Sequence, residues 1–92
     1  MFWIPRVNVI QSDAGFSVQV LGRTGLEYRQ GEKVMFIDSE VLAKRGIAVL
    51  ASSIRAWKPP FDKETVTQTQ KMEIIENVKA AIAFANDFVV VK

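Results

Sequence analysis

The chain changes character at the stretch Ile54-Arg55-Ala56-Trp57-Lys58-Pro59-Pro60-Phe61, which separates a β-rich segment from a helical one. Neither Pro59 nor Pro60 has an N–H to donate to a β-ladder, and each biases the preceding residue towards extended geometry. We therefore expect the strands to end at this stretch and the helical part of the chain to begin beyond it.

Before this stretch the hydrophobic pattern has the period of two that is typical of strands. Residues 16–20 place Phe16, Val18 and Val20 on one face, and residues 7–10 also alternate. The turn residues at 12–15 lie between these two segments. The pattern predicts a β-hairpin.

A second hairpin is predicted from residues 26–29 and 33–38, which flank Gln30-Gly31-Glu32. The run 34–37 is apolar at every position. An edge strand with one face in water would alternate, so we expect this strand to be central in the sheet.

The segment that follows is less regular. Residues 39–45 are compatible with a short helical turn or a loop that ends at Gly46, and residues 47–51 and 53–57 predict a further strand with a bulge at Ser52-Ser53.

Beyond the two prolines, Thr67 and Gln70 form a T-x-x-Q capping box, which predicts a helix over residues 68–85. Residues 88–91 are apolar with strand character. The apolar positions of the helix fall on one stripe: Ile74, Ile75, Val78, Ala81, Ile82 and Ala85. The sequence predicts one α+β domain over residues 1–92, with an antiparallel sheet of about five or six strands, one long helix on one face and a final strand.

The composition removes several classes of chemistry. The 92 residues include no cysteine and no histidine. Disulfides, thiolate nucleophiles, Ser-His-Asp mechanisms and His-based or Cys-based zinc sites are therefore excluded. We expect no enzymatic activity, no cofactor and no metal site.

Charge and hydropathy give weaker indications. Twelve Lys and Arg against ten Asp and Glu leave a net charge of +2, and the basic residues are scattered. Nucleic-acid binding is therefore not favoured. The apolar N-terminal run stops at Pro5, too short for a signal peptide. We expect a soluble, cytoplasmic protein.

The stretch 54–61 also holds the densest aromatic, proline and cation cluster of the chain. Trp57 and Phe61 would be apolar anchors for a partner, since aromatic residues are enriched at binding hot spots. The alternative is that Trp57 packs in the core at the end of a strand. As candidate partner-binding residues we take Arg55, Trp57, Lys58, Pro59, Pro60 and Phe61.

Asp38-Ser39-Glu40 is the densest acidic spot. Paired carboxylates can serve acid–base chemistry or hold a divalent cation, but Asp-Ser after a strand is also an ordinary turn or helix-start signal, and we favour that interpretation. We include Asp38 and Glu40 among the candidate partner contacts.

Several segments together resemble a known family. They are residues 24–28 and 37–42, Ser53-Ile54 with Trp57 and Pro59-Pro60, and a helix of the form K-x-x-I-I-x-x-V-x-x-A-I-x-F. The pattern covers most of the chain and is similar to small bacterial immunity proteins, closest to the polymorphic-toxin immunity family numbered seventy-four.

This resemblance implies an α+β domain that is encoded beside a toxin and neutralises it by covering its surface. Immunity proteins against nucleases tend to be acidic, and a net charge of +2 departs from that pattern. Two alternatives stay open: a self-associating module that forms a homodimer through a strand edge or an apolar strip, and a weakly basic nucleic-acid-binding domain.

Overall fold

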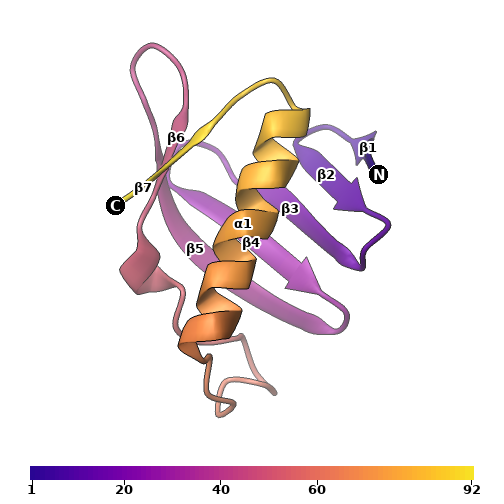
Figure 1. Cartoon of the computed structure of the whole chain (residues 1–92), viewed down its shortest axis with the longest axis vertical. Coiled ribbons are helices and arrows are strands. Elements are labelled where there is room, and N and C mark those ends of the chain that lie inside the picture. The colour runs from indigo at the N-terminus through magenta and orange to yellow at the C-terminus, as the bar shows by residue number, and fades with distance from the viewer.

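The structure, a computed structural model, describes all 92 residues. Seven strands form one sheet in chain order, and one long helix runs diagonally across one of its faces (Figure 1). The elements are β1 (Phe2–Arg6), β2 (Val9–Ser12), β3 (Phe16–Val20), β4 (Gly25–Gln30), β5 (Lys33–Val41), β6 (Ile47–Val49), α1 (Gln68–Phe84) and β7 (Val89–Val91). The predicted α+β architecture is confirmed, with seven strands instead of five or six.

The strand order follows from short connections. Each strand from β1 to β5 pairs antiparallel with the next one along the chain. The exception is β7, which pairs parallel with β6 because α1 carries the chain back across the sheet before it. The antiparallel sheet is thus completed by one parallel pair.

The N-terminal region differs from the prediction. The sequence placed one strand at residues 7–10, whereas the structure has two strands that meet at a turn through Val7 and Asn8. Asn8 has a φ of 64°, in the left-handed region that asparagine tolerates better than most residues. Pro5 lies in β1, an edge strand, where a missing N–H is tolerated.

The strand β5 is longer than predicted. Asp38, Ser39 and Glu40 lie inside it, so the expected turn or helix start at these residues is wrong. Ser39 and Glu40 continue the ladder by pairing with Val49 and Ala48 of β6, and only residues 42–46 form a loop. The central position of β5 between β4 and β6 is confirmed.

The strand β6 is shorter than predicted. It ends at Val49, and Ala51–Ser53 form a 3-10 turn where a continuous bulged strand was expected. Ser53 Oγ explains the difference, since it donates to the Leu50 carbonyl at 2.6 Å and accepts from the Asp38 N–H at 2.9 Å. Side-chain hydrogen bonds of this kind compete with a β-ladder.

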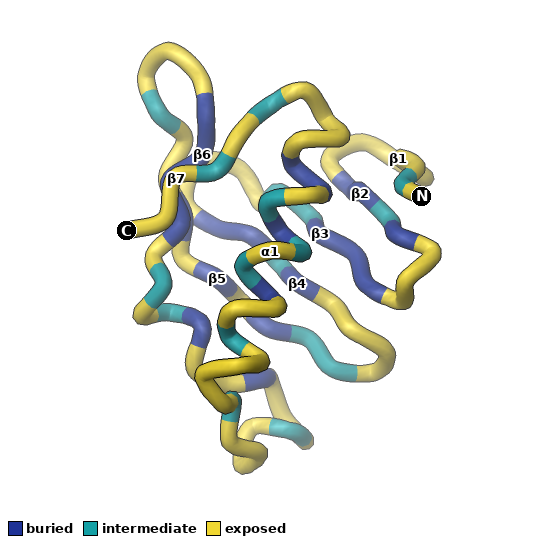
Figure 2. The backbone as a smooth tube through the Cα atoms, viewed as in Figure 1, coloured by how far each residue is buried: buried dark blue, intermediate teal, exposed yellow.

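The helix α1 begins as predicted. Thr67 Oγ1 accepts from the Gln70 N–H at 3.1 Å, and Gln70 Oε1 accepts from the Thr67 N–H at 3.0 Å, which completes the capping box. The buried turns of the helix face the sheet, as the dark segments of α1 in Figure 2 show. The buried helical residues are Ile74, Val78, Ala81 and Ile82.

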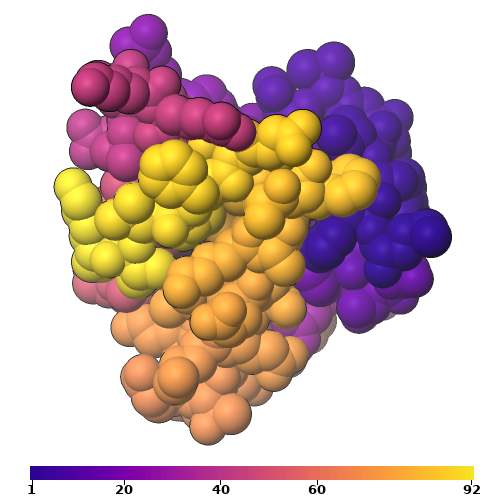
Figure 3. Space-filling model, turned by 45° about the horizontal axis from the view of Figure 1, so that its top comes forward, coloured from indigo at the N-terminus to yellow at the C-terminus, as the bar shows by residue number.

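The core lies between α1 and the sheet. Its strand residues include Val18, Leu26, Tyr28, Met35 and Ile37, all fully buried. Figure 3 shows this side of the molecule, where the orange-to-yellow helix and C-terminal segment lie across the front and the indigo N-terminal strands lie beside them. We call this side the helix-covered face, and the opposite side of the sheet the helix-free face.

Candidate partner-binding surface

The stretch 54–61 crosses one end of the molecule, and Trp57 turns inwards there. Trp57 is only 5% exposed, and its ring centroid lies 6.2 Å from that of Tyr28 in β4. The alternative in which Trp57 packs in the core is therefore correct. The assumption that it is an exposed anchor is wrong, because the strand ends and the helix enclose the ring.

Lys33 covers the aromatic pair of this stretch. Its Nζ atom lies 5.8 Å from the ring centroid of Trp57 and 5.6 Å from that of Phe61, within cation–π range. The same Nζ donates to Glu64 Oε1 at 2.6 Å. Phe61 is partly buried against the core, and Lys33 at the start of β5 contacts its ring.

The other candidate residues of this stretch remain on the surface. Arg55, Lys58, Pro59 and Pro60 are exposed. The Lys58 N–H donates to the Val34 carbonyl at 2.7 Å, so the chain is pinned to β5 immediately before the two prolines. The exposed prolines form a fixed corner, and their role in binding stays a prediction.

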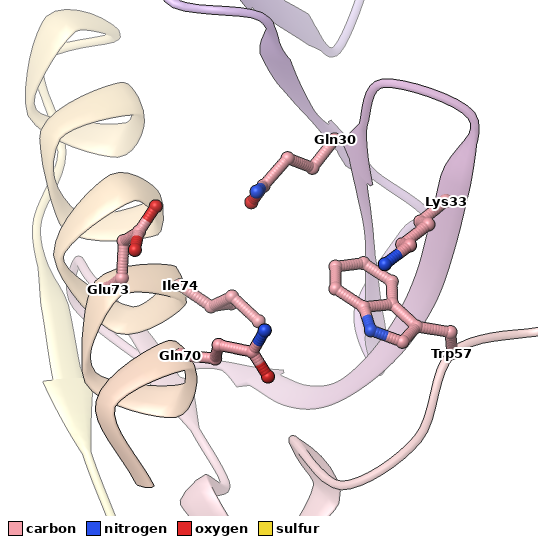
Figure 4. Close-up of a pocket in the computed structure, with 6 residues that line it drawn as sticks. All are labelled: Gln30, Lys33, Trp57, Gln70, Glu73 and Ile74. Carbon is pink, nitrogen blue, oxygen red and sulfur yellow. The ribbon is translucent and has the colours of Figure 1, made fainter. Parts of the chain in front are cut away.

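A small cleft lies beside Trp57, between α1 and the β4–β5 hairpin (Figure 4). Its volume is about 90 Å³. That is room for about three water molecules, and small-molecule sites typically need about 300–1,000 Å³. The lining residues are Gln30, Lys33, Trp57, Gln70, Glu73 and Ile74. The cleft is therefore smaller than a typical small-molecule site.

Tyr28 connects the sheet to the helix next to this cleft. Its hydroxyl donates to Gln30 Oε1 at 2.7 Å and accepts from Asn77 Nδ2 at 2.9 Å. Burial raises the pKa of the Tyr28 hydroxyl; the hydrogen bond from Asn77 lowers it in part, and the negative charge of Glu73 adds to the increase. Tyr28 is thus a neutral hydrogen-bonding link in the core.

The two acidic candidates lie elsewhere, on the helix-free face. Asp38 and Glu40 are exposed and alternate along β5 with the buried Ile37 and Ser39. Neither carboxylate forms an ion pair. The structure contains no group of three or more Asp or Glu side chains placed to hold a metal ion.

Lys58 joins the two sets of candidates across the helix-free face. Its Nζ lies 3.3 Å from Glu27 Oε2, and Arg29 Nη2 lies 2.9 Å from Glu27 Oε1. Glu27 pairs in the ladder with Phe36 of β5. Lys58, one of the two basic residues of the stretch 54–61, therefore reaches β4, the strand next to the one that holds Asp38.

Phe36 is the surface residue that the sequence prediction missed. It is 42% exposed, on the same side of β5 as Asp38 and Glu40. The apolar run 34–37 predicted a central strand without distinguishing its two faces, and of these four residues only Met35 and Ile37 are fully buried. The alternation of Leu26, Glu27, Tyr28 and Arg29 in the neighbouring strand was the signal that could have placed Phe36 outwards, because Glu27 lies opposite Phe36 in the ladder.

Fold and surface together define a small α+β domain with a helix-covered core and a mixed apolar and charged face on the other side of its sheet. The family model Immunity protein 74 matches residues 18–91, and the chain belongs to this family. Searches of curated proteins and of solved structures gave no match. The helix α1 is neither long nor apolar enough to cross a membrane.

Proposed function

We propose that this protein is an immunity protein that binds a cognate bacterial toxin and neutralises it by covering a surface that the toxin needs. Family membership over residues 18–91 is the observation that carries the proposal. The match runs from the middle of β3 to the end of β7, and so it includes the stretch 54–61 and the part of the helix-free face on β4 and β5.

The proposed mechanism is occlusion without catalysis. A domain of this kind needs a rigid surface of its own, and the packed sheet under the helix-free face provides one. The proposed contacts are Arg55, Lys58, Pro59, Pro60 and Phe61 at the end of the molecule, and Asp38 and Glu40 on the face. Trp57 supports the contacts from inside the core.

We further propose that the protein acts in the bacterial cytoplasm. An immunity protein must meet the toxin where the toxin would damage the producing cell or its neighbour. The absence of cysteine fits a reducing compartment.

The proposal is tested by co-expression with the toxin encoded by the neighbouring gene. A bacterial host that produces the toxin alone should die or stop growing, and a host that also produces this protein should survive. The purified pair, with an inactivated toxin, should form a stable complex by calorimetry. Survival that does not improve, together with no complex, would reject the immunity function. If the protein forms a dimer and does not bind the toxin, the self-associating alternative is favoured.

A further inference from the structure

Phe36 is held in place on the helix-free face by a glycine in the next strand. A Cβ atom at Gly25 would lie 2.5 Å from Cε1 of the Phe36 ring, so the ring lies directly against the Gly25 backbone. The φ of Gly25 is not in the left-handed region, so this glycine provides space and not conformational freedom. An exposed aromatic ring that is already fixed loses little side-chain freedom when a partner covers it.

The charges around Phe36 are unevenly distributed. On one side, Glu27 is neutralised by two cations, Arg29 and Lys58. On the other side, Asp38 and Glu40 continue along the same face of β5 with no cation bonded to them. The face therefore presents the Phe36 ring with two carboxylates beside it, Asp38 and Glu40, that form no ion pair.

Other regions of the molecule do not combine a ring packed on a glycine with unpaired carboxylates. Phe88, which is 48% exposed, packs on Gly46 in the same way, but the adjacent Asp87 pairs with Arg45. The cleft beside Trp57 has a volume of only about 90 Å³. A second hollow on the face, near Gln11 and Arg29, is shallow and mostly polar in its lining. Phe84 is similarly exposed at 46%, but it packs against Phe2, with ring centroids 5.7 Å apart, and no unpaired acidic pair lies in its helical turn.

We infer that the toxin docks on the helix-free face, with Phe36 as its central anchor. The inference rests on the proposed function and names the surface that carries it. The complementary toxin surface is an apolar depression that accepts the Phe36 ring, bordered by Lys or Arg side chains that face Asp38 and Glu40. Buried aromatic anchors carry most of the affinity in such interfaces, while complementary charges at the rim govern the association rate.

The first test is Phe36→Ser, measured as the dissociation constant of the complex with the inactivated toxin. We expect the constant to rise by about 30-fold or more, which corresponds to the loss of a hot spot. Phe84→Ser is the matched control, since it removes a similarly exposed phenylalanine from the helix-covered face. We expect this control to change the constant by less than about threefold.

The second test reverses the charges with Asp38→Lys and Glu40→Lys together. Both side chains are exposed, so the fold should tolerate the change and the far-ultraviolet circular dichroism should stay that of the wild type. We expect the association rate to fall by about tenfold at low salt, and the difference to shrink as salt is added.

The outcomes separate this inference from the immunity function. If the wild-type protein does not bind the toxin, the proposed function fails. If the wild type binds and both the Phe36 and the charge-reversal variants bind equally well, the function stands and the docking face is wrong. Loss of binding in Phe84→Ser with retention in Phe36→Ser would move the interface to the helix-covered face.

Discussion

The two faces of β5 differ in burial although both are formed by the same nine residues. Met35 and Ile37 point towards α1 and are fully buried, whereas Phe36 and Asp38 point away from it and are exposed. A buried face is constrained by close packing at every atom, whereas an exposed face makes fewer such contacts and can vary more freely. The helix-covered face therefore determines stability and leaves the helix-free face available for recognition.

The largest effect that this comparison predicts is on the covered face. Ile37→Ala should lower the free energy of unfolding by about 2 to 5 kcal/mol, because it leaves a cavity in the core. Denaturation in urea measures the change. In the same strand, Phe36→Ala should cost much less, since water already reaches the ring. Equal losses at the two positions would show that the helix-free face is also part of the core.

A smaller effect on stability is expected at the contact between β4 and β5 on the helix-free face. Gly25→Ala should destabilise the protein by about 1 kcal/mol, because the new Cβ displaces the Phe36 ring. In a Phe36→Ala background the same change should be neutral or slightly stabilising, since alanine then only restricts the unfolded chain. A double-mutant cycle by urea denaturation measures this coupling, and additive effects would contradict the contact.

The covered face should also respond to alkaline pH through Tyr28, the only tyrosine of the chain. Its pKa in the folded protein is above the ordinary value, so folding favours the protonated hydroxyl. This contribution to stability is complete below about pH 10 and decreases as the pH rises through the folded pKa. Absorbance of the tyrosinate follows the ionisation directly. Tyr28→Phe should lack the alkaline loss, and an unchanged loss in that variant would assign it to another group.

The smallest effect is predicted for the ion pairs of the helix-free face. Lys58→Met removes one of the two cations at Glu27, and Arg29 remains. The Lys58 side chain is 48% exposed, so the free energy of unfolding should change by at most about 1 kcal/mol. The midpoints of urea denaturation at low and at high salt measure this change in stability. A loss as large as that of Ile37→Ala would mean that Lys58 holds the proline stretch in place.

The helix and the central hairpins could be predicted because their signals are local. The capping box at Thr67 and Gln70 fixes the start of α1 through two hydrogen bonds between neighbours in the sequence. Phe2–Arg6 carries no such signal, since Pro5 argues against a strand. The pairing of this segment with β2 is also irregular, with a register shift between Trp3 and Arg6. The strand β1 exists because β2 offers it a partner, which is a tertiary effect.

The candidate site could be predicted only in part for the same reason. Trp57 beside two prolines has the same sequence pattern whether its ring is exposed or buried. Its burial depends on Tyr28 and Lys33, which are distant along the chain. The exposure of Phe36 depends on whether a second layer covers the sheet, and a run of four apolar residues does not contain that information.

The one parallel pair of the sheet has a consequence for the order in which the molecule assembles. The hairpins from β1 to β6 join segments that are close in sequence, whereas Val89 meets Ile47 only after the intervening helix has been placed. Contacts that close long loops form late and open early. We expect the amides of Val90 and Lys92 to exchange with deuterium sooner than those in the middle of β4. Slower exchange at β7 than at β4 would contradict this sequence of events.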